Sequence, residues 1–175
     1  HENCFLTPLL LWLMVSIDRD STVGLILSAG LICTVKEDAP IYLMFVALWM
    51  FFEKKKLLKP ALLLGFAVTY FLVAVWYLDS HGDGAMLYRY ANFSEEGGSI
   101  MDIVRACVTN PGYVFSQCLD AEKLEYALKI LLPLGFLPLF CGRAHHYILL
   151  GPFMLMNLMS YYPYQHSLDF QYNFG

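Results

Sequence analysis

Residues 57–78 read LLKPALLLGFAVTYFLVAVWYL, and Lys59 is the single charged residue among them. At 1.5 Å per residue, a helix over this stretch is about 33 Å long, which matches the roughly 30 Å hydrocarbon core of a bilayer. The stretch therefore predicts a full-length transmembrane helix.

The composition of the whole chain agrees with this prediction. Of its 175 residues, 58% are hydrophobic, 16% are aromatic and only 15% are charged, whereas about 25% are charged in ordinary soluble domains. A soluble domain of this size has too little interior to bury so much apolar surface. The formal net charge of -4 offers no basic surface for nucleic acid. We therefore expect the lipid bilayer as a partner, and no nucleic acid.

Five shorter apolar segments, of 12 to 17 residues each, accompany this stretch. They are Cys4–Ile17, Val23–Val35, Ile41–Phe52, Leu124–Phe140 and Tyr147–Met159. Helices of that length reach only about 18–26 Å, so either polar residues enter the membrane or some segments are re-entrant or interfacial. We predict an all-α polytopic membrane protein with about six hydrophobic helices. The chain starts at His1 rather than Met, so we expect residues 1–175 to be one transmembrane domain and a fragment of a longer protein.

The distribution of charge predicts the orientation of these segments. The strongest basic cluster lies in residues 53–59, and basic loops of membrane proteins face the cytoplasm. Alternation of the segments then places residues 79–123 and 160–175 outside. Six of the eleven Lys and Arg residues fall inside, whereas twelve of the fifteen acidic residues fall outside or at outer helix ends. The sequence therefore predicts a multi-pass protein with an acidic extracytoplasmic face.

The outer stretch 79–123 predicts short amphipathic helices rather than a linker. Ser99 can cap a helix whose apolar residues recur at i, i+3, i+4 and i+7, namely Ile100, Ile103, Val104 and Cys107. Such a helix suits the surface of the outer leaflet. Asp120 can cap the next helix. Cys107 and Cys118 share this stretch, and the sequence leaves open whether they form a disulfide.

Three consecutive charges, Lys36-Glu37-Asp38, separate two short apolar segments. Asp38 can cap the following helix, with Pro40 in its first turn. Because both segments are short, we expect the charges to lie below the outer headgroups, where they are costly unless they pair or line a wet cavity. Two interpretations stay open. One is a tight hairpin with a solvated tip, and the other is a polar cavity in which Glu37 and Asp38 act as acid, base or metal ligands and Lys36 binds an anion.

Two other strings carry candidate metal ligands. Asp79, His81 and Asp83 offer oxygen and nitrogen atoms within a Gly-containing turn. Hard cations such as Mg²⁺ or Mn²⁺ favour carboxylates of this kind, although a solvated turn is the competing interpretation. His1 and Glu2 form a second His–carboxylate pair at the start of the chain.

Two aromatic strings predict binding of phosphate or sugar. In Tyr88-Arg89-Tyr90, the guanidinium can hold a phosphate bidentately while the rings stack on a sugar or a lipid. The tail adds further hydrogen-bonding groups, namely His166, Asp169, Gln171 and Tyr172. For both strings the competing interpretation is an interfacial belt of aromatic residues.

In this order, the strings resemble a bacterial family of predicted membrane proteins, domain of unknown function 2079. The likeness covers nearly the whole chain, and it rests on His1-Glu2, Val35-Lys36-Glu37-Asp38, the basic inner loop, Tyr88-Arg89-Tyr90, residues 132–139 and residues 165–172. That family is similar to the C-type glycosyltransferase superfamily. The resemblance implies a site on the extracytoplasmic face of the bacterial inner membrane, a polyprenyl-phosphate-linked sugar and acidic residues that act with a divalent cation. It also implies that the catalytic Asp of the first outer loop precedes His1.

The resemblance thus implies a glycosyltransferase-like membrane protein that transfers a hexose or pentose. Glycosyl transfer needs a base for the acceptor and positive charge for the departing phosphate. Glu37 or Asp38 are the candidates for the base, and Lys36 or Arg89 are the candidates for the positive charge. A transporter or flippase is the first alternative, and it predicts polar residues throughout the membrane depth. A non-catalytic membrane subunit is the second, and it predicts no convergent cavity. The sequence does not identify the sugar, the acceptor, the metal or the oligomeric state.

Overall fold

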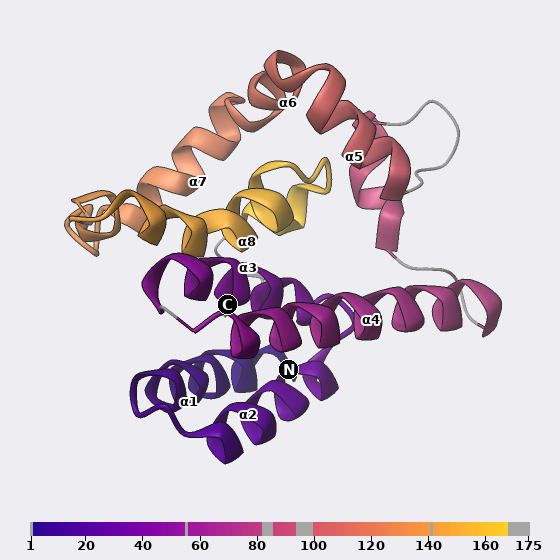
Figure 1. Cartoon of the computed structure of the whole chain (residues 1–175). Coiled ribbons are helices and arrows are strands. Elements are labelled where there is room, and N and C mark those ends of the chain that lie inside the picture. The colour runs from indigo at the N-terminus through magenta and orange to yellow at the C-terminus, as the bar shows by residue number, and fades with distance from the viewer. Residues whose placement is uncertain (1, 55, 82–85, 94–99, 141, 168–175) are drawn as a thin grey trace. The chain divides into compact units, whose positions relative to one another are not determined.

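The computed structural model describes residues 2–54, 56–81, 86–93, 100–140 and 142–167, and in this part of the chain the ordered elements are all helical (Figure 1). The prediction of an all-α fold is confirmed. The chain divides into two compact units, one of residues 1–83 with residues 174–175 and one of residues 84–173.

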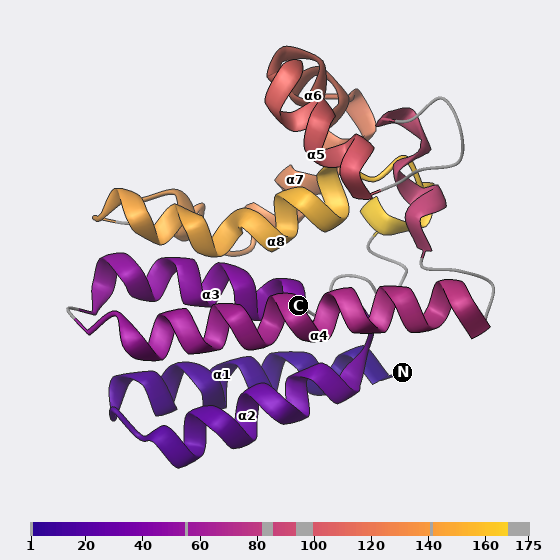
Figure 2. The same cartoon turned by 45° about the vertical axis from the view of Figure 1, so that its right-hand side comes forward.

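The first unit contains four α-helices that form two antiparallel hairpins (Figure 2). The helices are α1 (Leu6–Asp18), α2 (Thr22–Val35), α3 (Pro40–Glu53) and α4 (Leu58–His81), and a 3₁₀ turn, Glu2–Phe5, precedes α1. Helix α2 also contacts both α3 and α4. These four helices match the first four predicted apolar segments to within about three residues at each end, because charged residues bound each apolar run.

Ion pairs join the two hairpins at one end of this unit. Asp20 Oδ1 lies 2.6 Å from Lys59 Nζ, and Asp18 Oδ1 lies 3.7 Å from Lys54 Nζ. The α1–α2 turn and the α3–α4 link therefore lie at the same end. The α2–α3 link, which contains Lys36, lies at the opposite end of the antiparallel helices.

Local contacts explain where α2 and α3 begin. Ser21 is the N-cap of α2, and its hydroxyl oxygen accepts a hydrogen bond from Gly24 N at 3.2 Å. Pro40 occupies the first turn of α3, as predicted. The prediction that Asp38 caps α3 is wrong, because Ala39 holds the N-cap position and Asp38 Oδ2 accepts a hydrogen bond from Lys36 Nζ at 2.7 Å.

Apolar side chains cover the outside of the four helices. Those that are exposed include Leu11, Val15, Val23, Ile26, Leu62 and Trp76. Exposed apolar surface on this scale is typical of a face that contacts lipid or a partner. Within the described residues, α4 alone is long and apolar enough to cross a membrane by itself, while α1, α2 and α3 are shorter apolar helices.

The second unit is a series of shorter helices. They are η2 (Met86–Phe93), α5 (Ile100–Thr109), α6 (Pro111–Cys118), α7 (Ala121–Leu131), η3 (Leu137–Phe140), η4 (Ala144–Leu150), α8 (Gly151–Phe153), the π-helical turn η5 (Met154–Leu158) and η6 (Pro163–His166). Asp120 caps α7 as predicted, since its Oδ1 accepts a hydrogen bond from Ala121 N at 2.6 Å.

A small core ties the elements of this unit together. Phe93, Cys118 and Met159 form its buried centre, and Tyr90 packs against it. Helix α5 is amphipathic as predicted, but its apolar side chains divide between two directions. Ile103 and Ala106 pack against the core, whereas other apolar residues of α5 are exposed, namely Met101, Val104 and Val108.

The two cysteines of the outer stretch are both free thiols. Cys107 is exposed on α5, and Cys118 is buried in the core. Burial raises the pKa of the Cys118 thiol. The structure therefore contains no disulfide between them.

The predicted helix Leu124–Phe140 is wrong in its second half, because α7 ends at Leu131. Pro133 has no N–H to continue the helical hydrogen bonds. Gly135 and Phe136 both have positive φ angles, 58° and 57°, and Phe136 N donates to Leu131 O at 3.0 Å. This is the hydrogen bond of a Schellman-type helix end, so the Leu-Pro-rich string forms a turn and a short 3₁₀ helix.

Candidate functional site

The charged link between α2 and α3 is a recessed ion-pair cluster. Lys36 Nζ lies 2.7 Å from Asp38 Oδ2 and 3.9 Å from Glu37 Oε1. The Lys36 side chain is only 11% exposed, and those of Glu37 and Asp38 are 26% and 21% exposed. These fractions are low for charged residues of a hairpin tip, and mutual pairing reduces the cost of removing the charges from water.

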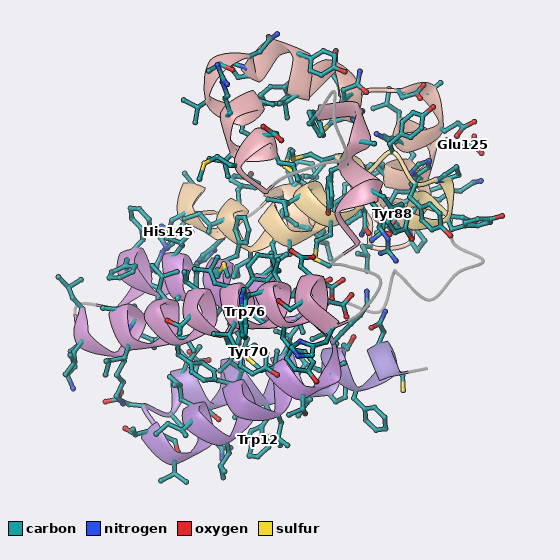
Figure 3. The ribbon with its side chains drawn as sticks, turned by 90° about the vertical axis from the view of Figure 1, so that its right-hand side faces the viewer. Trp12, Tyr70, Trp76, Tyr88, Glu125 and His145 are labelled. Atoms are coloured by element: carbon teal, nitrogen blue, oxygen red, sulfur yellow. The ribbon has the colours of Figure 1, made fainter. Side chains whose placement is uncertain are left out.

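Lys36 and Glu37 line a cavity of about 410 Å³ between the end of α2 and the side of α4. The α4 wall of the cavity includes Tyr70 and Tyr77, and Figure 3 shows Tyr70 between the ribbons of α4 and of the α1–α2 pair. The cavity therefore combines one ammonium group, one carboxylate and aromatic rings. Such a set suits a ligand that carries both an anionic group and a sugar ring.

The same cluster does not fit a divalent cation in this arrangement. The Lys36 ammonium lies within ion-pair distance of both carboxylates and so takes the place that a metal ion would need. Mg²⁺ and Mn²⁺ require carboxylate oxygens that are open to the ion. The expected Mg²⁺ or Mn²⁺ stays a prediction.

In the second unit, Arg89 links two strings that are far apart in the sequence. Its side chain is buried, at 5% exposure, and Nη1 donates a hydrogen bond to Gln165 Oε1 at 3.0 Å. The guanidinium carbon lies 5.3 Å from the centre of the Tyr162 ring and 5.9 Å from that of Tyr88, within the range of cation–π contacts. Arg89 O also accepts a hydrogen bond from Tyr161 N at 2.7 Å. Here Arg89 holds the tail in place, and its contacts are with protein groups.

His166 lies beside this link and next to the first turn of α7. Its side chain is 8% exposed, and Nε2 lies 3.7 Å from Glu122 Oε2. Burial, and then the nearby Lys123 ammonium, lower the pKa of His166, while Glu122 opposes the shift. The lowered pKa favours the neutral form of the His166 ring. The ring lines a cavity of about 360 Å³ together with Glu122, Glu125 and Lys129.

The exposed apolar surface of the first unit agrees with the result of a family comparison. The model of a family described as a predicted membrane protein, DUF2079, matches residues 1–174. The chain belongs to the DUF2079 family. It is therefore a membrane protein, and the family description names no activity. No curated protein and no solved structure matches the chain.

The structure of this DUF2079 chain does not bring the predicted metal ligands of α4 together. Asp79 and His81 lie in the last turn of α4, so the turn predicted over these residues is wrong. Residues two apart on a helix do not face each other, and the His81 ring stacks on Tyr77 at 4.7 Å between centres. The other predicted residues lie outside the described part of the chain or have undescribed side chains: His1, Glu2, Asp83, Asp169, Gln171 and Tyr172.

Sequence reasoning missed several residues that surround the predicted ones. Glu122 approaches His166, Gln165 binds Arg89, and Tyr162 packs on both Arg89 and Tyr88. Glu122 carried one signal, its place in the first turn after the capping Asp120. The pairing of Arg89 with Gln165 spans 76 positions in the sequence and carried none.

Proposed function

We propose that this DUF2079 chain belongs to a multi-pass protein of the bacterial inner membrane that binds a polyprenyl-phosphate-linked sugar at its extracytoplasmic face and transfers the sugar. The observation that carries the proposal is the cavity that Lys36 and Glu37 line together beside the membrane-spanning length of α4. A lipid-linked substrate can reach such a cavity from the bilayer, while an acceptor enters from water.

The charge of the two ends of the first unit supports this orientation. Lys54, Lys56 and Lys59 lie in or beside the α3–α4 link, at one end of the first unit. Lys36 lies in the α2–α3 link, at the other end, because α3 runs between the two links. The positive-inside rule assigns the end with three lysines to the cytoplasm. Lys36 and Glu37 then face the extracytoplasmic side.

The chemistry follows from the groups that line the cavity. Glu37 accepts the proton of the acceptor hydroxyl while that oxygen bonds to the anomeric carbon of the sugar. The bond between this carbon and the phosphate oxygen breaks, and its electron pair leaves with the polyprenyl phosphate. The Lys36 ammonium neutralises the charge that develops on the phosphate. Asp38 positions Lys36 through its 2.7 Å ion pair, and Tyr70 and Tyr77 provide rings for stacking on the sugar.

The test compares variants of the full-length protein in membranes. We expect Glu37→Gln to reduce sugar transfer at least about 100-fold, the usual contribution of a general base. Glu53→Gln makes the same chemical change at the opposite end of α3, and we expect it to leave transfer unchanged. The assay follows radiolabelled glucose, mannose and arabinose supplied on undecaprenyl phosphate.

Two results would overturn the proposal. One is full transfer by Glu37→Gln at a normal protein level. The other is movement of the labelled lipid across the membrane without sugar transfer by the wild-type protein, which would replace the enzyme with the transporter alternative. The orientation is checked by cysteine labelling after the exposed Cys4 and Cys107 are changed to Ser. Lys56→Cys should react only from inside, and Ser80→Cys only from outside.

A further inference from the structure

A second charged cavity lies at the opposite end of the first unit, in the hairpin turns. It has a volume of about 290 Å³, and its lining includes Lys54, Lys56, Lys59 and Asp20. We infer that this cavity binds a phosphate-bearing anion, of the kind that an anionic phospholipid presents in its headgroup. The inference is independent of the proposed sugar transfer, since the two cavities share no residue.

The charges of this cavity do not balance. Three ammonium groups line it together with the carboxylate of Asp20. Asp20 Oδ1 lies 2.6 Å from Lys59 Nζ, and its Oδ2 lies 3.4 Å from Lys56 Nζ. The third ammonium group, that of Lys54, lies 3.7 Å from Oδ1 of Asp18, which does not line the cavity. Two carboxylates therefore engage three ammonium groups, and one positive charge stays in excess. A phosphodiester, which carries one negative charge, reduces that excess.

The backbone around Asp20 holds the lysines in place before any ligand binds. Lys59 Nζ donates to Asp20 O at 3.0 Å as well as to its carboxylate. Asp20 itself has a φ of 51°, a left-handed conformation that Asp tolerates better than most residues. The fixed turn thus fastens the α4 lysine to the α1–α2 hairpin. Less side-chain freedom is then lost when an anion binds.

The remaining walls of the cavity suit the rest of a phospholipid. Leu25 of α2 and Met50 of α3 line it together with Ile17 and Pro60, so the lining combines apolar and cationic side chains. The helices that form it carry exposed apolar residues along their length. A basic pocket between membrane helices at the end assigned to the cytoplasm lies at the depth of anionic headgroups.

The test measures lipid binding to the full-length protein purified in a neutral detergent. Native mass spectrometry counts bound phosphatidylglycerol, with phosphatidylcholine as the zwitterionic comparison. We expect phosphatidylglycerol to bind preferentially and Lys56→Gln to weaken its binding about fivefold, the typical effect of one lysine at an anionic surface. Lys56 is 79% exposed, so its replacement leaves the fold intact. Lys59→Arg keeps the charge and should retain binding.

Arg19→Gln is the matched control, because Arg19 is an exposed cation of the same turn that does not line the cavity. Equal losses in Lys56→Gln and Arg19→Gln would overturn the inference, since they would reflect net charge alone. Equal binding of phosphatidylcholine and phosphatidylglycerol would also overturn it. Displacement of the lipid by millimolar inorganic phosphate would support the anion site and assign its occupant to the aqueous phase.

Discussion

Among the described glycines, Gly24 of α2 has the least space for a side chain, because Ser16 of α1 lies against it. A Cβ atom at this position would lie 2.5 Å from Ser16 Oγ and 3.0 Å from Ser16 Cβ. Ser16 Oγ already donates a hydrogen bond to Trp12 O at 2.8 Å, so it can move away only by breaking that bond. Gly24→Ala must therefore separate the helices or rotate Ser16, at about 1–3 kcal/mol.

The higher helix propensity of Ala offsets at most about 1 kcal/mol of this cost. We therefore expect Gly24→Ala to lower the free energy of unfolding by roughly 1 kcal/mol. The measurement is unfolding of the full-length protein in mixed micelles by titration with SDS, followed by tryptophan fluorescence. Ser16→Ala removes Oγ, the atom closest to the added Cβ. The double variant with Ser16→Ala and Gly24→Ala should therefore regain part of the lost stability, but not all of it, since the Cβ of residue 16 still lies 3.0 Å from the added Cβ.

Gly30 provides the matched control on the same helix, because a Cβ there would have no neighbour within 4 Å. Gly30→Ala gains propensity without a clash, and we expect it to raise stability by up to about 1 kcal/mol. If Gly24→Ala were as stable as Gly30→Ala, the tight α1–α2 contact would be refuted. The difference between the two variants is the informative quantity, since both change the same residue type.

Two further predictions concern the second unit. Gly135→Ala should destabilise the second unit by about 1–2 kcal/mol, because Gly135 has a φ of 58°, at which a Cβ atom is strained even though no neighbour lies within 4 Å. Gly112→Ala is the control, since Gly112 has open space and no positive φ, and it should leave the stability unchanged. Hydrogen exchange of the α7 amides measures the stability of both variants. The pKa of His166 lies below its ordinary 6.5 in the folded chain. The unfolded chain therefore binds a proton at His166 more readily than the folded chain does, and the free energy of unfolding declines as the pH falls below about 6.5. The protection of Tyr161 N–H against exchange should fall between pH 7 and pH 5, and His166→Gln should remove that dependence; an unchanged pH response in the variant would assign the effect to another group.

The positions of the first four helices could be predicted from the sequence because their limits are local. Charges at residues 18–20, 36–38 and 53–56 interrupt the apolar runs, and α1 to α4 end or begin beside them. Asp120 as the cap of α7 was equally local. Signals of this kind depend on a residue and its near neighbours, and they need no knowledge of the tertiary fold.

The predictions of the α3 cap and of the end of α7 were wrong because two local interactions competed at each place, and the sequence does not show which of them is stronger. Asp38 was a reasonable cap for α3, but the Lys36 ammonium binds its carboxylate instead. Residues 124–140 are apolar enough for a helix, yet Pro133 and Gly135 end it at Leu131. In both places a second local feature competes with the one that the pattern indicates.

The contacts of Arg89 illustrate a different limit. Arg89 and His166 are predicted to bind ligands, and in the structure each also contacts a distant segment of the chain: Arg89 contacts Gln165 and Tyr162, and His166 approaches Glu122. A buried Arg needs hydrogen-bond acceptors wherever it lies. The residue types that recognise a phosphate or a sugar are therefore also those that join segments of the protein, and sequence alone does not separate the two uses.

The unequal lengths of α2 and α4 place the first cavity against the side of α4. Helix α2 has 14 residues, or about 21 Å, whereas α4 has 24, or about 36 Å. The α4 residues that line the cavity, from Tyr70 to Leu78, begin about 18 Å along that helix, and α4 continues to His81 beyond them. Lys36 and Glu37 therefore lie against the side of α4 rather than level with its end. Partly buried charges are costly unless they are paired, and the ion pairs of Lys36 with Glu37 and Asp38 meet that condition while leaving the ammonium and one carboxylate at the cavity wall.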